Sequence, residues 1–213
     1  MKRGTSSGVL KRIAAYLSYL RSLPENDETR MSAKRIAAFM CLGEVQVRKD
    51  LATATYPGSA KIGRSKKEMI HSLEQYLHLD CKRKTIYIGM GELMPWIERN
   101  CGDYLDISAR FRPYARPNGS VISLSKCRAY CRENEIELAI IDVTEKEMDR
   151  VLTVLEGSGI KMIWNFSPVL VPNQEGICIR NEDILGSLGV LSFSSGLDCD
   201  ILKTASEEQE RTI

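Results

Sequence analysis

The 213-residue chain lacks the features of membrane, secreted and zinc-binding proteins. It has no run of about 18 apolar residues, the length that spans a bilayer. Its start, Met1-Lys2-Arg3, does not lead into the apolar stretch of a signal peptide. The seven cysteines form no Cys-x-x-Cys pair and there are only two histidines, whereas a zinc site needs about four closely spaced ligands. These absences predict a soluble, cytoplasmic protein with free thiols and no metal site.

Catalytic patterns are missing as well. The sequence shows no paired carboxylates, no nucleophile motif and no histidine after His78. A dehydrogenase would need an intact cofactor-binding motif and a general acid or base near the nicotinamide. We therefore expect a protein that is not an enzyme.

Charge is distributed unevenly along a chain whose net charge is only +2. Residues 1–80 carry fourteen Lys and Arg against eight Asp and Glu, whereas residues 81–213 carry sixteen against twenty. A basic first part suggests that it binds a polyanion and that the acidic second part does not. The alternative is a basic face that is merely solvated.

The first eighty residues follow a helical pattern. Apolar residues of the first helix recur at intervals of three and four, namely Val9, Leu10, Ile13, Leu17 and Leu20. Pro24 ends this helix, and Ser32 is suited to cap a second one. Gly43 makes a short turn before a third helix over residues 44–53, and a closing helix is expected over 69–79. Two helices joined by a short turn are the layout of a helix-turn-helix.

Side chains suited to DNA follow this turn. Gln46 and Arg48 can read adenine and guanine edges in the major groove, and Lys49 suits phosphate. Asp50 is interpreted as an internal partner of Arg48 or Lys49. Residues 56–66 have the composition of the wing of a winged helix, and further DNA contacts are expected from Ser59, Lys61, Arg64, Lys66 and Lys67. The alternative is an exposed charged helix without a ligand.

The second half alternates strands and helices, which is typical of a parallel sheet with helices on its faces. Strands are expected at residues 85–89, 105–111, 138–143, 161–165 and 177–179, and helices at 92–100, 126–133 and 145–156. Right-handed crossovers would make this domain Rossmann-like. We predict a winged-helix domain at 1–80, a Rossmann-like dimerisation domain at 84–193 that ends in a helix, and a disordered tail at 194–213.

Residues 84–94 form a damaged dinucleotide-binding fingerprint. An apolar strand runs into Gly89-Met90-Gly91, as a phosphate-binding turn requires, but Met94 stands in place of the third glycine. Arg112 stands where an acid normally binds the ribose. The predicted cofactor site therefore consists of Gly89, Met90, Gly91, Glu92, Leu93, Met94 and Arg112.

Four motifs in one order resemble the Rex family of redox-sensing transcriptional repressors. They are the run from Gln46 to Leu51, the glycine-centred wing, the Gly-x-Gly turn, and residues 165–169, Asn-Phe-Ser-Pro-Val. The resemblance covers about residues 8–193. It implies a homodimer that binds double-stranded operator DNA through a winged helix, binds NAD(H) in a Rossmann domain, and exchanges a C-terminal helix between subunits. In the family, NADH binding releases the DNA.

The resemblance also assigns roles to three single residues. Asn165 would lie near the nicotinamide, with a purely structural role at a strand end as the alternative. Asp183, at the start of the exchanged helix, would pair with Arg12 of the other subunit. The alternative for these two is a pair of unrelated surface charges.

Departures from the family pattern gather at the fingerprint. Glu92 places a carboxylate near a helix N-terminus, where it repels pyrophosphate. Met94 must push the helix away from the strand or find a cavity. Asn100 stands in place of a tyrosine that is thought to couple the cofactor to domain closure.

Together with Arg112, these changes predict a repressor whose NADH/NAD sensing is weakened, lost or altered. Three alternatives stay open. The protein is still switched by NADH; it uses NADP(H), since Arg112 suits a 2′-phosphate; or it is a dimeric interaction protein that does not bind DNA.

Overall fold

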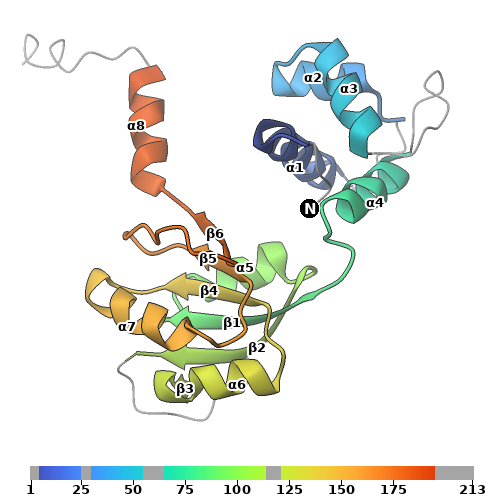
Figure 1. The fold of residues 1–213 in the computed structure, drawn as a ribbon. Coiled ribbons are helices and arrows are strands. Elements are labelled where there is room, and N and C mark those ends of the chain that lie inside the picture. The colour runs from blue at the N-terminus through green and yellow to red at the C-terminus, as the bar shows by residue number, and fades with distance from the viewer. Residues whose placement is uncertain (1–4, 25–29, 55–64, 114–120, 195–213) are drawn as a thin grey trace, which may run out of the picture. The chain divides into compact units, whose positions relative to one another are not determined.

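The chain forms two compact units that divide between Lys82 and Arg83. The computed structural model describes residues 5–24, 30–54, 65–113 and 121–194. In Figure 1 the first unit is drawn as helices and the second as a sheet flanked by helices. Among the described residues, none of the helices has the length and apolar character needed to cross a membrane.

The first unit contains four helices, α1 (Ser7–Ser22), α2 (Ala33–Met40), α3 (Glu44–Ala54) and α4 (Lys66–Tyr76). The Ser32 hydroxyl accepts a hydrogen bond from the Arg35 amide at 3.2 Å, so the predicted cap of α2 is confirmed. Cys41 ends α2 in the left-handed conformation, and α3 begins at Glu44. The helix-turn-helix is therefore α2, a short turn and α3.

The prediction that Lys66 and Lys67 belong to the wing was wrong, because α4 begins at Lys66, three residues before the predicted start of the closing helix. Ser65 caps α4 and, with Glu68, forms a capping box. The Lys66 ammonium is buried and donates to the carbonyl oxygens of Leu23 and Pro24, at 3.2 and 2.6 Å. It holds α4 against the end of α1.

All four helices contribute to one apolar core. Its fully buried side chains include Ile13, Tyr16 and Leu20 of α1, together with Ile36, Val47 and Leu73. Burial of these side chains, each worth about 1.5–3 kcal/mol relative to exposure, fixes the helices against one another. Helix α3, the second helix of the helix-turn-helix, is thus a rigid part of the unit.

The second unit is a six-stranded sheet in which every strand pair is parallel. Its strands are β1 (Arg83–Gly89), β2 (Leu105–Arg112), β3 (Ile122–Ser123), β4 (Leu138–Asp142), β5 (Met162–Asn165) and β6 (Cys178–Asn181). Its order, β3-β2-β1-β4-β5-β6, is that of the Rossmann fold. The predicted fold class is confirmed, with a topological switch point between β1 and β4.

Helices cover both faces of this sheet. On one face, α5 (Met94–Cys101) shares a cluster with Tyr87 of β1 and Ile140 of β4. On the other, α6 (Cys127–Glu133) and α7 (Glu145–Leu155) pack over Ile86 and Ile88. Successive β1 side chains point to opposite faces, so Tyr87 lies under α5 while its neighbours lie under α6 and α7.

Apart from the start of α4, the described elements differ from the predicted ones mainly at two places, β3 and the start of α5. The strand β3, which leads into a 3₁₀ turn at Leu124–Lys126, was not predicted because two residues carry no periodicity. Helix α5 starts at Met94 and not at Glu92. The last helix, α8 (Ile184–Ser194), follows Asp183 as expected, and the tail from residue 195 onward lies outside the described residues.

Candidate nucleic-acid interface and nucleotide-binding turn

Helix α3 presents its predicted DNA-contact residues to solvent. Gln46, Arg48 and Lys49 are exposed, whereas Val47 and Asp50 are buried. Arg48 forms an i, i+4 ion pair with Glu44 along the exposed face of the helix. Exposed pairs of this kind contribute only about 0.3–0.5 kcal/mol, so the Arg48 guanidinium can exchange Glu44 for a base edge. Helix α3 thus presents two side chains that can hydrogen-bond to bases, Gln46 and Arg48, and the exposed ammonium group of Lys49.

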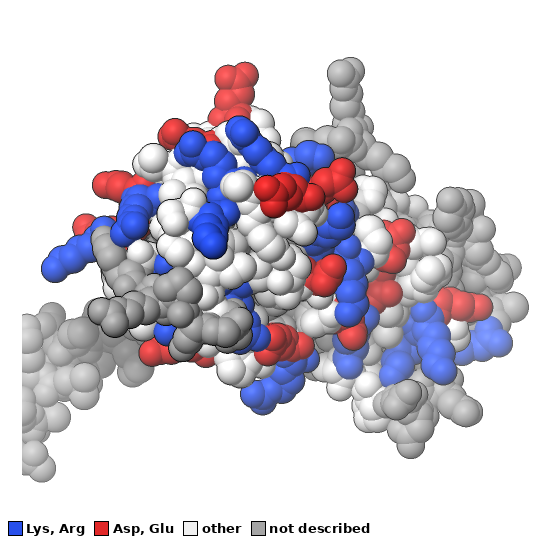
Figure 2. All heavy atoms as spheres, turned by 90° about the horizontal axis from the view of Figure 1, so that it is seen from below, with Lys and Arg blue, Asp and Glu red and all other residues white. Residues whose placement is uncertain are grey.

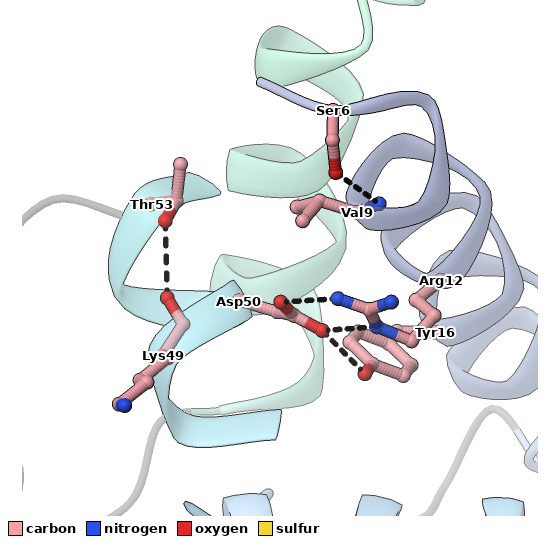
Figure 3. A network of polar contacts seen from close by, with 7 residues as sticks. All are labelled: Ser6, Val9, Arg12, Tyr16, Lys49, Asp50 and Thr53. Atoms are coloured by element: carbon pink, nitrogen blue, oxygen red, sulfur yellow. Dashed lines mark hydrogen bonds and ion pairs between the residues drawn. The ribbon is translucent and has the colours of Figure 1, made fainter. Parts of the chain in front are cut away.

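Asp50 does not orient Arg48 or Lys49, so that prediction was wrong. Its carboxylate accepts a bidentate pair of hydrogen bonds from Arg12 of α1, at 2.7 and 3.0 Å, and a third from the Tyr16 hydroxyl at 2.9 Å. Figure 3 shows the three side chains converging between α1 and α3. Asp50 follows Lys49 in sequence but points to the opposite side of the helix, into the unit.

In this network a positively charged Arg12 and a neutral Tyr16 donate hydrogen bonds to a negatively charged Asp50. The hydrogen bonds from Arg12 hold the pKa of the Asp50 carboxyl below its ordinary value, and the bond from Tyr16 acts in the same direction. Burial, together with the bond to Asp50, raises the pKa of Tyr16 to about 12. Asp50 is therefore ionised and Tyr16 neutral at physiological pH. A charged, three-fold hydrogen-bonded carboxylate fixes the rotation of α3 about its axis, and with it the direction of Lys49.

The predicted wing residues Ser59, Lys61 and Arg64 lie outside the described residues. On the face of the molecule drawn in Figure 2, basic and acidic side chains lie interspersed and form no continuous field of one sign. Among the described elements, α3 with exposed Arg48 and Lys49 is the one considered for a polyanion.

The glycine turn follows β1 as predicted. A side chain at Gly89 would bring Cβ within 2.2 Å of the Asp142 carbonyl oxygen, so only glycine fits where β1 and β4 end side by side. Gly91 has φ +93°, a conformation that favours glycine. Both glycines of the fingerprint therefore stand at positions that favour glycine.

Met94 fills the space where a third glycine would allow close packing. Its side chain is 2% exposed and packs with Tyr87, Ile97, Leu138 and Ile140 between α5 and the sheet. Met94 is thus accommodated as a buried side chain between α5 and the sheet. Glu92 is exposed and precedes Leu93, the N-cap of α5, which makes no side-chain capping bond. A carboxylate thus stands just before the N-terminus of α5.

Arg112 ends β2 beside the turn. Its guanidinium donates to the carbonyl oxygen of Met90 at 2.9 Å. The arginine is thus tied to the glycine turn, at the edge where a Rossmann fold holds the ribose. Asn100, by contrast, turns back on α5 and donates to the Trp96 carbonyl oxygen at 2.7 Å.

Asn165 is fully buried and serves the loop after β5. Its amide nitrogen donates to the Val169 carbonyl oxygen and the Asn181 side chain, at 2.7 and 2.8 Å. Its oxygen accepts from the Ser167 amide at 3.0 Å. These bonds engage both ends of the side chain, which supports the structural alternative for this residue.

The residues predicted as a switch have partners within the chain. Arg12 is held by Asp50, as described above. Asp183 is exposed and accepts from the Gly186 amide at 2.7 Å, so it caps the start of α8. None of the described residues of α8 is buried, and Leu185, Leu188, Leu191 and Phe193 are all more than half exposed.

One pair at the turn was not predicted. The Tyr87 hydroxyl donates to the carboxylate of Asp142, the last residue of β4. Burial, reinforced by this carboxylate, raises the pKa of Tyr87 well above its ordinary value. Within the sequence, Tyr87 lies in an apolar strand and gives no sign of a polar role.

Comparisons with known proteins cover both units. A family model described as "Putative DNA-binding protein N-terminus" matches residues 5–52. The redox-sensing transcriptional repressor Rex of Clostridium perfringens is 27% identical over 201 residues, 90% of this chain and 95% of that protein. Rex of Caldanaerobacter subterraneus is 27% identical over 197 residues, 88% of each chain.

Two solved structures share the fold of the whole chain. The crystal structure of RSP, a Rex-family repressor, matches with a TM-score of 0.78 and 23% identity, over 96% of this chain and all of that one. RSP in complex with β-NAD+ and operator DNA matches with a TM-score of 0.80 and 24% identity, over 97% and 99% of the two chains.

Proposed function

We propose that this chain, which is similar to Rex repressors over about 90% of its length, is a DNA-binding transcriptional repressor whose response to NADH/NAD is weakened, lost or altered. The observation that carries the DNA-binding part is the exposed row of Gln46, Arg48 and Lys49 on α3. The network of Asp50, Arg12 and Tyr16 holds that helix in place. Curated Rex relatives are redox-sensing transcriptional repressors, and a structural relative is solved with operator DNA.

The two basic residues have different roles in this proposal. Arg48 reads a guanine edge, because its guanidinium can donate two parallel hydrogen bonds, and Gln46 reads adenine in the same manner. Lys49 neutralises a phosphate, which contributes equally on every sequence. Ser59, Lys61 and Arg64, which lie outside the described residues, are proposed to add further DNA contacts.

A salt-dependent DNA titration tests this division. We expect Lys49→Ala to weaken specific and random DNA alike and to reduce the slope of log K against log salt by about one. Arg48→Ala is expected to weaken the specific site by about 1–3 kcal/mol and to relax its sequence preference. Lys146→Ala, an exposed lysine of α7 in the second unit, is the matched control for loss of one positive charge.

Fluorescence anisotropy at several salt concentrations measures all three variants. Equal effects of both α3 variants on specific and random DNA would refute the assigned roles. Absence of salt-dependent DNA binding by the wild-type chain would favour the dimeric interaction protein instead.

The effector side of the proposal concerns the second unit. A structural relative is solved with β-NADH, and the turn here keeps Gly89 and Gly91 but adds Glu92 and Met94. Arg112 beside the turn favours a 2′-phosphate, so NADP(H) is the second candidate. Calorimetric titration of NADH, NAD and NADPH distinguishes loss of dinucleotide binding from a preference for NADH or for NADP(H). NADH binding at micromolar Kd would overturn the proposal that the response to NADH is weakened.

We further propose a cytoplasmic homodimer in which α8 is exchanged between subunits. The supporting observation is the row of exposed apolar side chains on α8. An apolar surface of this kind on a folded protein marks a site of interaction with another molecule. In this dimer Asp183 meets Arg12 of the other subunit in one conformational state, in competition with Asp50.

A charge-swap cycle tests the proposed pair of Asp183 and Arg12. Asp183→Arg and Arg12→Asp each weaken DNA affinity, and the double variant is expected to restore part of it. Simple additivity of the two losses would contradict the pair. Because Arg12 also serves Asp50, Asp183→Arg alone is the cleaner single variant.

No catalytic role is proposed. The curated relatives are described as repressors.

A further inference from the structure

The amides of a glycine turn at a Rossmann switch point normally face the pyrophosphate of a dinucleotide. In this chain they face a protein side chain. The backbone N–H groups of Gly91 and Leu93 interact with the phenol oxygen of Tyr87 and act to lower its pKa, against the larger effects of burial and Asp142. The same hydroxyl donates its proton to the Asp142 carboxylate. Tyr87 is 1% exposed, so this arrangement belongs to the interior of the unit.

The topology explains why these two residues meet. Tyr87 points to the α5 face of the sheet, and its hydroxyl reaches beneath the turn that leads into α5. Gly89 and Asp142 are partners in the parallel register of β1 and β4, so both strands end at the same edge. Because Gly89 has no side chain, the Asp142 backbone can approach it closely. The carboxylate is thereby placed within reach of Tyr87.

We propose that Tyr87 and Asp142 occupy the anion site of the glycine turn from inside the protein, so that this Rossmann unit excludes a dinucleotide pyrophosphate. The Tyr87 hydroxyl group takes the place that a phosphate oxygen would occupy at the turn. Its oxygen accepts from the turn amides, and its proton is held by a carboxylate. An entering pyrophosphate would have to displace this oxygen and would then lie beside Asp142, with the exposed Glu92 near the helix N-terminus as a second negative charge.

The packing around Tyr87 also keeps its hydroxyl at the turn and so opposes binding of a pyrophosphate. Met94 and Tyr87 share one buried cluster, so the ring cannot move away from the turn without opening a cavity under α5. The residues present therefore do not fit the cofactor that the family binds. This inference deepens the proposed loss of NADH sensing and depends on the proposed function only for its consequence in the cell.

The test uses the full chain and ADP, the part of the dinucleotide that carries a diphosphate. In Tyr87→Phe combined with Asp142→Asn, the ring stays in place while the competing oxygen and the carboxylate charge are removed. We expect calorimetry to show ADP binding at least tenfold tighter in this variant than in the wild-type chain. Tyr130→Phe is the matched control, since Tyr130 bonds the Ser108 carbonyl oxygen on the other face of the sheet.

Amide exchange gives a second readout that does not require ligand binding. In Tyr87→Phe the amides of Gly91 and Leu93 lose their acceptor, so their hydrogen exchange is expected to accelerate at least several-fold, with no such change in Tyr130→Phe. Equal ADP affinity in the wild-type chain and the double variant, whether tight or absent, would overturn the proposal. DNA binding of the wild-type chain is measured separately, so failure of the proposed function is distinguishable from failure of this inference.

Discussion

Two adjacent charged positions on α3 have opposite environments. Lys49 is exposed, whereas Asp50 is 5% exposed and accepts three hydrogen bonds. Helical geometry separates them by about 100°, which is enough to send one side chain to solvent and the next into the core. A single α-helical turn thus carries both a candidate phosphate contact and the group that holds the helix in place.

Asp50→Asn tests the stabilising role of this carboxylate. Because the folded-state pKa of Asp50 is lowered, its stabilising contribution is full above about pH 4, the pKa of an unfolded aspartate, and disappears as pH falls through the lower folded value. At pH 7 we expect the variant to melt about 4–8 °C below the wild-type chain. Below pH 3 the difference is expected to narrow.

Calorimetric melts of the full chain at both pH values measure this effect. Asp80→Asn is the control, since Asp80 is exposed and lies in the same unit. An equal melting difference for Asp50→Asn at pH 7 and at low pH would contradict a contribution from the ionised carboxylate.

Partners of single polar residues were the least predictable feature. The partner of Asp50 lies 38 positions away on another helix, so inspection of neighbours suggested Arg48 or Lys49 instead. Tyr87 and Asp142 are 55 positions apart, and their contact depends on the exact register of β1 against β4. Periodicity places a residue on a face of an element but does not determine which residue of another element it meets.

At the scale of elements, prediction succeeded where a repeating pattern was long. The recurrence of Ile13, Leu17 and Leu20 identified α1, and the apolar run ending at Gly89 identified β1 and its turn. It failed for β3, where two residues carry no period. The start of α4 was missed because Ser65 and Glu68 form a capping box within a stretch whose composition suggested a loop.

The start of α5 provides a prediction at this scale. Met94→Gly restores the third glycine of the fingerprint, yet the structure predicts loss of stability and no gain of function. The buried methionine is surrounded by Tyr87, Ile97 and Leu138, so its removal leaves a cavity that costs about 2–5 kcal/mol. We expect the free energy of unfolding in urea to fall by that amount.

Met90→Gly is the matched control, because Met90 lies in the same turn and is 54% exposed. Its effect on the free energy of unfolding is expected to stay within about 0.5 kcal/mol. Similar losses in the two variants, or none in Met94→Gly, would show that Met94 does not fill the space between α5 and the sheet.

For the whole molecule, the two units depend on different physical features for their proposed roles. The first unit keeps an anchored recognition helix, and the second keeps the Rossmann strand order while its glycine turn binds its own side chains. A repressor of this kind would stay on DNA irrespective of the NADH/NAD ratio. In the proposed dimer the interface between subunits would then matter more than the cofactor, because paired half-sites require two DNA-contacting helices at a fixed spacing.

Helix α8 is the element that we propose forms this dimer. Leu188 and Leu191 are 57% and 67% exposed, and a second copy of the chain would bury them. We expect the combined variant Leu188→Glu, Leu191→Glu to shift the wild-type dimer to monomer in light scattering at micromolar concentration, with at least tenfold weaker binding to a palindromic site. Leu170→Glu, the same change at a 62% exposed position of the same unit, is expected to leave the dimer intact. A dimer that survives both α8 substitutions, or a monomeric wild-type chain, would rule out α8 as the dimerising element.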